Sequence, residues 1–196
     1  MTDPLPAPEQ LFNHVRVVVG MVTSLGLARI LAGFARFVQH PDRERASFEH
    51  LAWATWLVLA LLHFWWFELA WASATVWSFE RYVFLVAYGA LHFFMAALLF
   101  PDDLRDYGSH RAYLIARRGL VFGFLIALAC VDLSDSWLKG PAHMRQLGAV
   151  YLVKQGGLIV LAAIAIRSRS PRFHAVFAAL AVLGEAGWIA WRHLTL

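Results

Sequence analysis

The stretch LGAVYLVKQGGLIVLAAIAI, residues Leu147–Ile166, decides the fold class of this chain. It is long enough to cross the hydrocarbon core of a bilayer as a single helix. It contains one ionisable side chain, Lys154. Because an ammonium inside hydrocarbon costs roughly 2.5–3.5 kcal/mol on insertion scales, we expect Lys154 to face protein or water and to have a partner. The neighbouring hydrophobic stretches offer two carboxylates, those of Asp132 and Glu185.

The overall composition also indicates an integral membrane protein. The 196 residues are 60% hydrophobic and only 15% charged, too little charge for the surface of a soluble domain. The net charge of +4 does not indicate nucleic-acid binding, because the basic residues are dispersed at the predicted helix ends. The partners we expect are membrane lipids, further copies of the chain or other membrane-protein subunits, and no nucleic acid.

The hydrophobic runs predict an all-α bundle of six transmembrane helices, which form a single domain over residues 15–196. Residues 1–14 contain three prolines and are predicted to form an extended periplasmic tail. Connections between the spans are short, which favours antiparallel packing of neighbours. The predicted spans are residues 15–38, 48–71, 76–100, 119–138, 147–166 and 173–191.

The longest polar segment is Pro101–Arg118, PDDLRDYGSHRAYLIARR. It is predicted to contain a short cytoplasmic interfacial helix, which Asp102 or Asp103 would cap. Tyr113 and Leu114 would lie on the membrane, with the arginines directed towards lipid phosphates. A docking site for a partner protein is the alternative interpretation of this segment.

The distribution of Lys and Arg predicts the orientation of the bundle. The linkers after the first, third and fifth spans hold ten such residues and the opposite side holds five. Because the side richer in Lys and Arg faces the cytoplasm, both termini are predicted to be periplasmic. The ten are Arg36, Arg43, Arg45, Arg105, Arg111, Arg117, Arg118, Arg167, Arg169 and Arg172, and the five are Arg16, Arg81, Lys139, Arg145 and Arg192.

Several short motifs resemble a family of small bacterial multi-pass inner-membrane proteins. The motifs are GLARIL around Arg29, HFWW at His63–Trp66, and LLFPDDL at Leu98–Leu104 followed by the Arg117–Arg118 pair. The resemblance covers about the first two thirds of the chain. It implies a location in the bacterial inner (cytoplasmic) membrane. It implies no activity and no catalytic residues, because the family is uncharacterised.

Polar residues within the spans form the candidate site. At a rise of 1.5 Å per residue, four of them on four different spans fall at one depth, slightly outside the bilayer midplane. This polar layer consists of His63, Asp132, Lys154 and Glu185, and the secondary polar residues are Arg29, Glu68, Arg81, Tyr88 and His92. Buried ion pairs can fix helix register without any function. Intramembrane ionisable residues usually mark transport pathways, however, and here the acids outnumber the lysine.

Glycines flank the charged residues of the layer. Gly156 and Gly157 follow Lys154, and Gly184 and Gly187 bracket Glu185. Small residues at these positions predict close contacts between helices. The alternative is that the helices loosen beside the charges and expose backbone carbonyls to an ion, as in transporters with broken helices.

Enzyme and cofactor signals are weak. The sequence contains no HExxH, no GxSxG, no Cys–His cluster with metal spacing and no glycine-rich phosphate loop. We therefore assign no catalytic residue and no metal ligand. Haem between His63 and His92 is disfavoured, because the two residues fall roughly 10 Å apart along the bundle axis. On the third span, the spacing of Arg81, Tyr88 and His92 places them on one inward helix face.

Two functions follow from the polar layer. One is a small transporter or proton-linked channel, in which His63 relays a proton from the layer outward towards Glu68. The alternative is a non-catalytic accessory or assembly subunit of a larger membrane protein complex, in which the buried charges serve packing alone.

Overall fold

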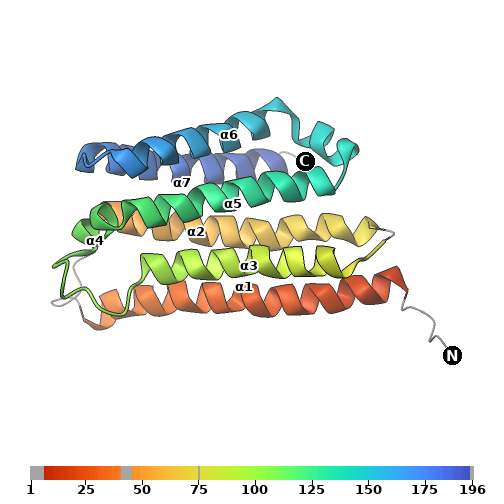
Figure 1. Ribbon diagram of the computed structural model, residues 1–196, viewed down its shortest axis with the longest axis horizontal. Coiled ribbons are helices and arrows are strands. Elements are labelled where there is room, and N and C mark those ends of the chain that lie inside the picture. Colours follow the sequence, from red (N-terminus) through yellow and green to blue (C-terminus); the bar gives the residue numbers. More distant parts are fainter. Residues whose placement is uncertain (1–6, 41–45, 75, 195–196) are drawn as a thin grey trace.

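Six long helices pack side by side in the computed structural model, which describes residues 7–40, 46–74 and 76–194 (Figure 1). Each is long and apolar enough to cross a membrane. The predicted all-α membrane bundle is therefore confirmed, with all six spans. The long helices are α1 (Pro8–Gln39), α2 (Phe48–Phe67), α3 (Phe79–Leu99), α5 (Arg118–Leu138), α6 (Pro141–Arg167) and α7 (Pro171–His193).

The start of α1 differs from the prediction. Residues 8–14 are helical, whereas the sequence was expected to remain extended up to residue 14. The helix begins at Pro8, where the missing N–H of proline costs no hydrogen bond and its fixed φ already suits a helix. Residues 1–6 of the predicted tail lie outside the described residues.

The connection between the second and third spans is longer than predicted. After Phe67 the chain tightens into a 3₁₀ helix, η1 (Glu68–Ser73), and α3 begins only at Phe79. The side chain of Ser78 accepts a hydrogen bond from the backbone N–H of Arg81 and so caps α3. This cap explains why the helix starts three residues after the predicted position, 76.

The helices pair in a pattern that separates α6 from α7. α1 packs along α3, α5 along α6 and α2 along α7. The consecutive helices α6 and α7 touch each other over much less of their length than these pairs do. The first turn of α1 and the last turn of α7 lie at one end of the bundle, and α4 (His110–Ala116) lies at the other end (Figure 1).

Three aromatic side chains fill the bundle interior towards the α4 end. Trp53, Phe122 and Phe177 are at most 2% exposed. The ring centroid of Trp53 lies 5.5 Å from that of Phe122 and 4.9 Å from that of Phe177. We call these three residues, which come from α2, α5 and α7, the aromatic plug.

The short helix α4 is present, but its surroundings differ from the prediction. Ser109, and neither Asp102 nor Asp103, caps it by accepting from the backbone N–H of Ala112. Tyr113 is 8% exposed and Leu114 is 2% exposed, so these side chains face protein and not the membrane surface. The reason is that α4 packs against α2 and α5, and this contact buries its apolar face.

Arg29 ties α1 to the connection that follows α3. Its guanidinium donates to the carbonyl oxygen of Phe100 at 2.6 Å and to the carboxylate of Asp102 at 2.7 Å. The hydrogen bond and charge of Arg29 lower the pKa of Asp102. Arg29 therefore serves the α4 end of the bundle and takes no part in the polar layer.

Helix α6 is broken at Gly148, one residue after the start of the predicted span. The backbone there has φ 69° and ψ −175°, a conformation available essentially only to glycine. The break separates a short first segment from the long segment that carries Lys154, and Figure 1 shows the change of direction near the α6 start.

Candidate functional site

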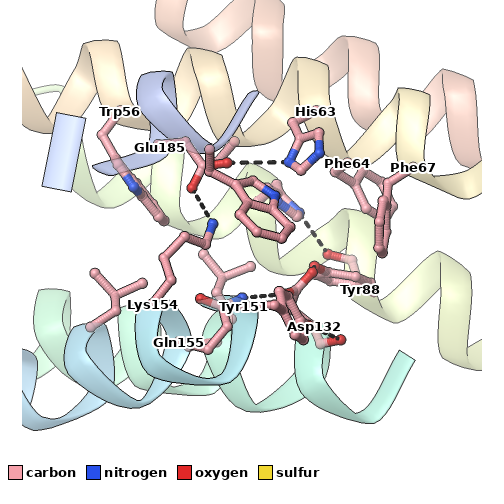
Figure 2. Close-up of a pocket in the computed structure, with 16 residues that line it drawn as sticks. Trp56, His63, Phe64, Phe67, Tyr88, Asp132, Tyr151, Lys154, Gln155 and Glu185 are labelled. Carbon is pink, nitrogen blue, oxygen red and sulfur yellow. Dashed lines mark hydrogen bonds and ion pairs between the residues drawn. The ribbon is translucent and has the colours of Figure 1, made fainter. Parts of the chain in front are cut away.

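Side chains from α2, α3, α5, α6 and α7 converge on a cavity of about 50 Å³ in the middle of the bundle (Figure 2). A cavity of this volume can hold water. The sequence-based estimate of depth is correct in bringing the polar layer together, because all four of its residues line this cavity: His63, Asp132, Lys154 and Glu185.

Glu185 is the centre of one half of the site. Lys154 Nζ donates to Glu185 Oε2 at 2.7 Å, and His63 Nδ1–H donates to Glu185 Oε1 at 3.2 Å (Figure 2). The side chains of Lys154, His63 and Glu185 are 19%, 12% and 6% exposed. The expected contact of Lys154 with a carboxylate is present, and Glu185 supplies it.

Asp132 forms the other half of the site and has only neutral partners. Tyr88 donates its hydroxyl to Oδ1 at 2.8 Å, and Tyr151 donates its hydroxyl to Oδ2 at 2.7 Å. The amide of Gln155 also donates to Oδ2. No ion pair of Asp132 occurs among the described residues. Three donors thus replace water around this carboxylate, but no cation balances its charge.

The charges of the pocket do not balance. Two carboxylates, Asp132 and Glu185, share the cavity with one ammonium, Lys154. With both acids ionised and His63 neutral, the pocket carries one net negative charge. Because an unbalanced charge in a buried site is costly, the pocket is suited to take up one further positive charge.

The secondary polar residues separate into two groups. Tyr88 and His92 line the cavity. His92 is 3% exposed, donates from Nδ1 to the carbonyl oxygen of Tyr88 at 3.1 Å, and stacks on Phe64. Arg81 lies outside the cavity, where it donates to the carbonyl of Val76 and its guanidinium lies over the ring of Trp71. The predicted inward face is therefore correct for Tyr88 and His92 and wrong for Arg81.

A second buried cluster, which the sequence analysis missed, lies at the η1 end of the bundle. Lys139 was assigned to a surface linker, yet its side chain is only 2% exposed. It donates to Glu68 Oε1 at 3.0 Å and to Asp135 Oδ2 at 2.5 Å. Asp135 also accepts from the indole N–H of Trp71. Here too, two carboxylates share one ammonium.

Helix α5 connects the cavity with this second cluster. Ser136 Oγ lies 2.8 Å from Tyr151 Oη, and Tyr151 in turn donates to Asp132. Asp132, Asp135, Ser136 and Lys139 are spaced by three, four and seven residues, which puts them on one helix face. This spacing is the sequence signal that identifies Lys139 as an inward residue.

The neighbour of His63 also differs from the expectation. Glu68, the predicted next group in an outward relay, is held by Lys139. Two rings lie beside His63 with centroids 5.5 Å away, that of Phe67 and that of His193 in the last turn of α7. Glu185, His63 and His193 therefore form a chain of titratable groups that leads from the cavity to the end of α7.

Neither prediction for the glycines of α6 and α7 is correct. A Cβ atom at Gly156, Gly157, Gly184 or Gly187 would meet no neighbouring heavy atom within 4 Å, so these residues make no close helix contact. They are also fully helical, so the helices are not loosened there. Instead α6 and α7 diverge at this level and leave a groove of about 220 Å³ between them.

No family model, no curated protein and no solved structure matches this chain. The geometry of the pocket is therefore the basis for its function.

Proposed function

We propose that this chain is a small proton-linked transporter of the bacterial inner membrane. The observation that carries the proposal is the pocket in which two acids, Asp132 and Glu185, lie beside one ammonium, Lys154, which pairs with Glu185 and leaves Asp132 with neutral partners. Such a pocket is neutral only when it holds one further positive charge, which a proton or a cationic solute can supply. Intramembrane acids that must change partners in this way are typical of proton pathways.

The surroundings of the pocket support access from one end at a time. Polar groups continue from Asp132 through Tyr151 and Ser136 towards the end of the bundle that holds Lys139. In the opposite direction the aromatic plug fills the interior. A site that is polar on one side and sealed on the other suits an alternating transporter better than a continuously open channel.

The orientation of the bundle is part of this proposal, and both termini are placed in the periplasm. Because Lys139 is buried, it does not count among the basic residues at the outer surface. The difference in surface Lys and Arg between the two sides is therefore larger than the difference counted in the sequence. Arg43 and Arg45, which belong to the basic side, lie outside the described residues. A C-terminal alkaline phosphatase fusion should be active and a C-terminal fluorescent-protein fusion dark, and the reverse pattern would contradict the orientation.

Proton flux into proteoliposomes tests the transport function. Purified protein is reconstituted with an internal pH dye, and a potassium diffusion potential is imposed with valinomycin. Wild type should acidify the lumen, and Asp132→Asn or Glu185→Gln should reduce the rate at least about tenfold, since a neutral amide cannot bind and release the proton. Asp103→Asn is the matched control, because the Asp103 side chain is 61% exposed and remote from the pocket.

The same preparation discriminates the alternative, an accessory subunit of a larger complex. In that case the wild type gives no proton flux, either alone or with candidate solutes added, and a triple replacement of Asp132, Lys154 and Glu185 by Asn, Met and Gln still folds. Well-packed neutral side chains can replace a buried ion pair without loss of stability, so an assembly role tolerates this change. Stoichiometric co-purification of another membrane protein would then identify the complex.

A further inference from the structure

The groove between α6 and α7 has one polar end and a long apolar wall. Lys154 and Glu185 line both this groove and the central cavity, so the two spaces meet at the ion pair. From Lys154 the groove follows α6 as far as Leu161, seven residues or roughly 10 Å. Its apolar lining consists of Trp56, Val153, Gly157, Leu158, Leu161, Phe177, Leu180, Ala181 and Gly184.

The size and position of the groove suit the tail of a membrane-dissolved molecule. An enclosed apolar cavity of about 150 Å³ already accommodates benzene, and this groove measures about 220 Å³. The groove is bordered by α6 and α7, and the outward faces of these helices are exposed: Val153 is 74% exposed and Leu180 is 54% exposed. In a bundle that spans the membrane these faces contact lipid, so the groove is open sideways to the bilayer.

The charge at the inner end selects the head group of such a molecule. With both acids ionised and His63 neutral, the pocket lacks one positive charge, since Lys154 is the single ammonium beside two carboxylates. Aromatic rings surround the space, and an ammonium over such a ring is attracted by its negative face. Lys154 Nζ itself lies 5.6 Å from the centroid of Trp188. The other rings that line the cavity are those of Trp56, Phe64, Phe67, Tyr88 and Tyr151.

A buried acceptor without a donor gives independent evidence for a ligand with N–H groups. The oxygen Gln155 Oε1 has no hydrogen-bond partner among the described residues, although Gln155 is only 5% exposed and lines the cavity. A buried amide oxygen of this kind costs free energy unless a donor reaches it. An alkylammonium head offers N–H donors as well as the missing charge.

We propose that the groove admits a lipophilic ammonium ion, with its alkyl tail between α6 and α7 and its head at Glu185. The proposal rests on the transport function above and names the substrate class. The bound head replaces the proton that otherwise balances the pocket, so one proton leaves an acid of the pocket for each ammonium that binds. Because Asp132 lines the same cavity, Lys154 can move towards it when the ligand occupies Glu185.

Four ligands with the same twelve-carbon tail test the head-group selectivity: dodecylamine, dodecyltrimethylammonium, dodecanol and dodecanoate. Their binding to wild-type protein in lipid nanodiscs is measured by calorimetry against empty nanodiscs, in two buffers of different ionisation enthalpy. Dodecylamine, an ammonium at pH 7, should bind at least about tenfold more tightly than dodecanol or dodecanoate and should release close to one proton. Dodecyltrimethylammonium, which has no N–H donor, should bind more weakly than dodecylamine.

Blocking the groove gives the second arm of the experiment. Gly184→Leu or Gly157→Leu places a side chain in the groove and should weaken dodecylamine binding at least about tenfold. Gly123→Leu is the control, since Gly123 is also helical with open space beside it but lies on α5, outside the groove. Equal binding of all four ligands, a preference for dodecanoate, or unchanged binding in the two folded groove variants would overturn the proposal.

Failure of this proposal is distinguishable from failure of the transport function. The proton-flux measurement uses no ligand, so flux without selective ammonium binding leaves proton transport standing and rejects the substrate class. If the protein binds dodecylamine selectively and releases a proton but gives no flux, proton conduction in the absence of solute is rejected. The ligand site is retained in that case.

Discussion

Lys139→Met is expected to destabilise the protein more than any other single side-chain replacement considered above. Lys139 is 2% exposed and lies between Glu68 and Asp135, which are 8% and 0% exposed. Removing the ammonium leaves two buried carboxylates that repel each other without a cation, and breaking a buried pair in this way costs about 3–5 kcal/mol. Thermal denaturation in detergent should show a large drop in melting temperature, together with a low expression yield.

Neutralising the two acids should restore stability to Lys139→Met. With Glu68→Gln and Asp135→Asn added, no buried charge remains, and most of the loss should be recovered; either acid substitution alone should recover only part. Arg105→Met is the control, because the Arg105 side chain is 91% exposed and its removal should leave the melting temperature nearly unchanged. A Lys139→Met protein as stable as Arg105→Met would contradict the buried position of Lys139.

Lys154→Met is expected to have the second-largest effect. Glu185 would lose its 2.7 Å ammonium contact while its side chain stays 6% exposed. The cost is again about 3–5 kcal/mol if the carboxylate remains charged. It should be smaller than at Lys139, since Lys154 is 19% exposed, Glu185 retains His63, and only one carboxylate loses its partner.

The pattern of rescue identifies the partner of Lys154. Adding Glu185→Gln should recover part of the stability lost in Lys154→Met, because it removes the uncompensated charge. Adding Asp132→Asn should not, because it leaves Glu185 without its ammonium and also replaces, by an NH2 group, one of the two oxygens that accept from Tyr88, Tyr151 and Gln155. Rescue by Asp132→Asn with none by Glu185→Gln would mean that Lys154 pairs with Asp132. Denaturation midpoints of the single and double variants decide between the two outcomes.

The sequence predicts the six spans and the shared depth of the polar layer well, for a physical reason. Apolar length must match bilayer thickness, and a helix rises by a fixed distance per residue, so depth follows from counting. Counting does not give the rotation of each helix about its axis. The choice of Glu185 over Asp132 as the partner of Lys154 depends on that rotation, and both acids were left open as partners by the sequence.

Other features of the site can be predicted from the sequence, but only when the spacing of residues along a helix is considered together with their depth in the bundle. Tyr151 lies three residues before Lys154 and four before Gln155, so it shares a helix face with each of them. Lys139 follows Asp135 by four residues and was misplaced because it lies one residue beyond the predicted span. The open space beside Gly157 and Gly184 could not be predicted, because small residues permit close packing without requiring it.

The two buried lysines also differ in how far along the chain their partners lie, which matters while the protein is being synthesised. Lys154 and Glu185 are 31 residues apart on consecutive helices, so a single hairpin can enter the membrane with its charges already matched. Glu68 is 71 residues from Lys139. At translation rates of about 5–20 residues per second, Glu68 waits roughly 4–14 s for its cation. During that interval the nascent chain carries an acid without its cation at the end of α2, and the arrival of α5 with Lys139 supplies that cation.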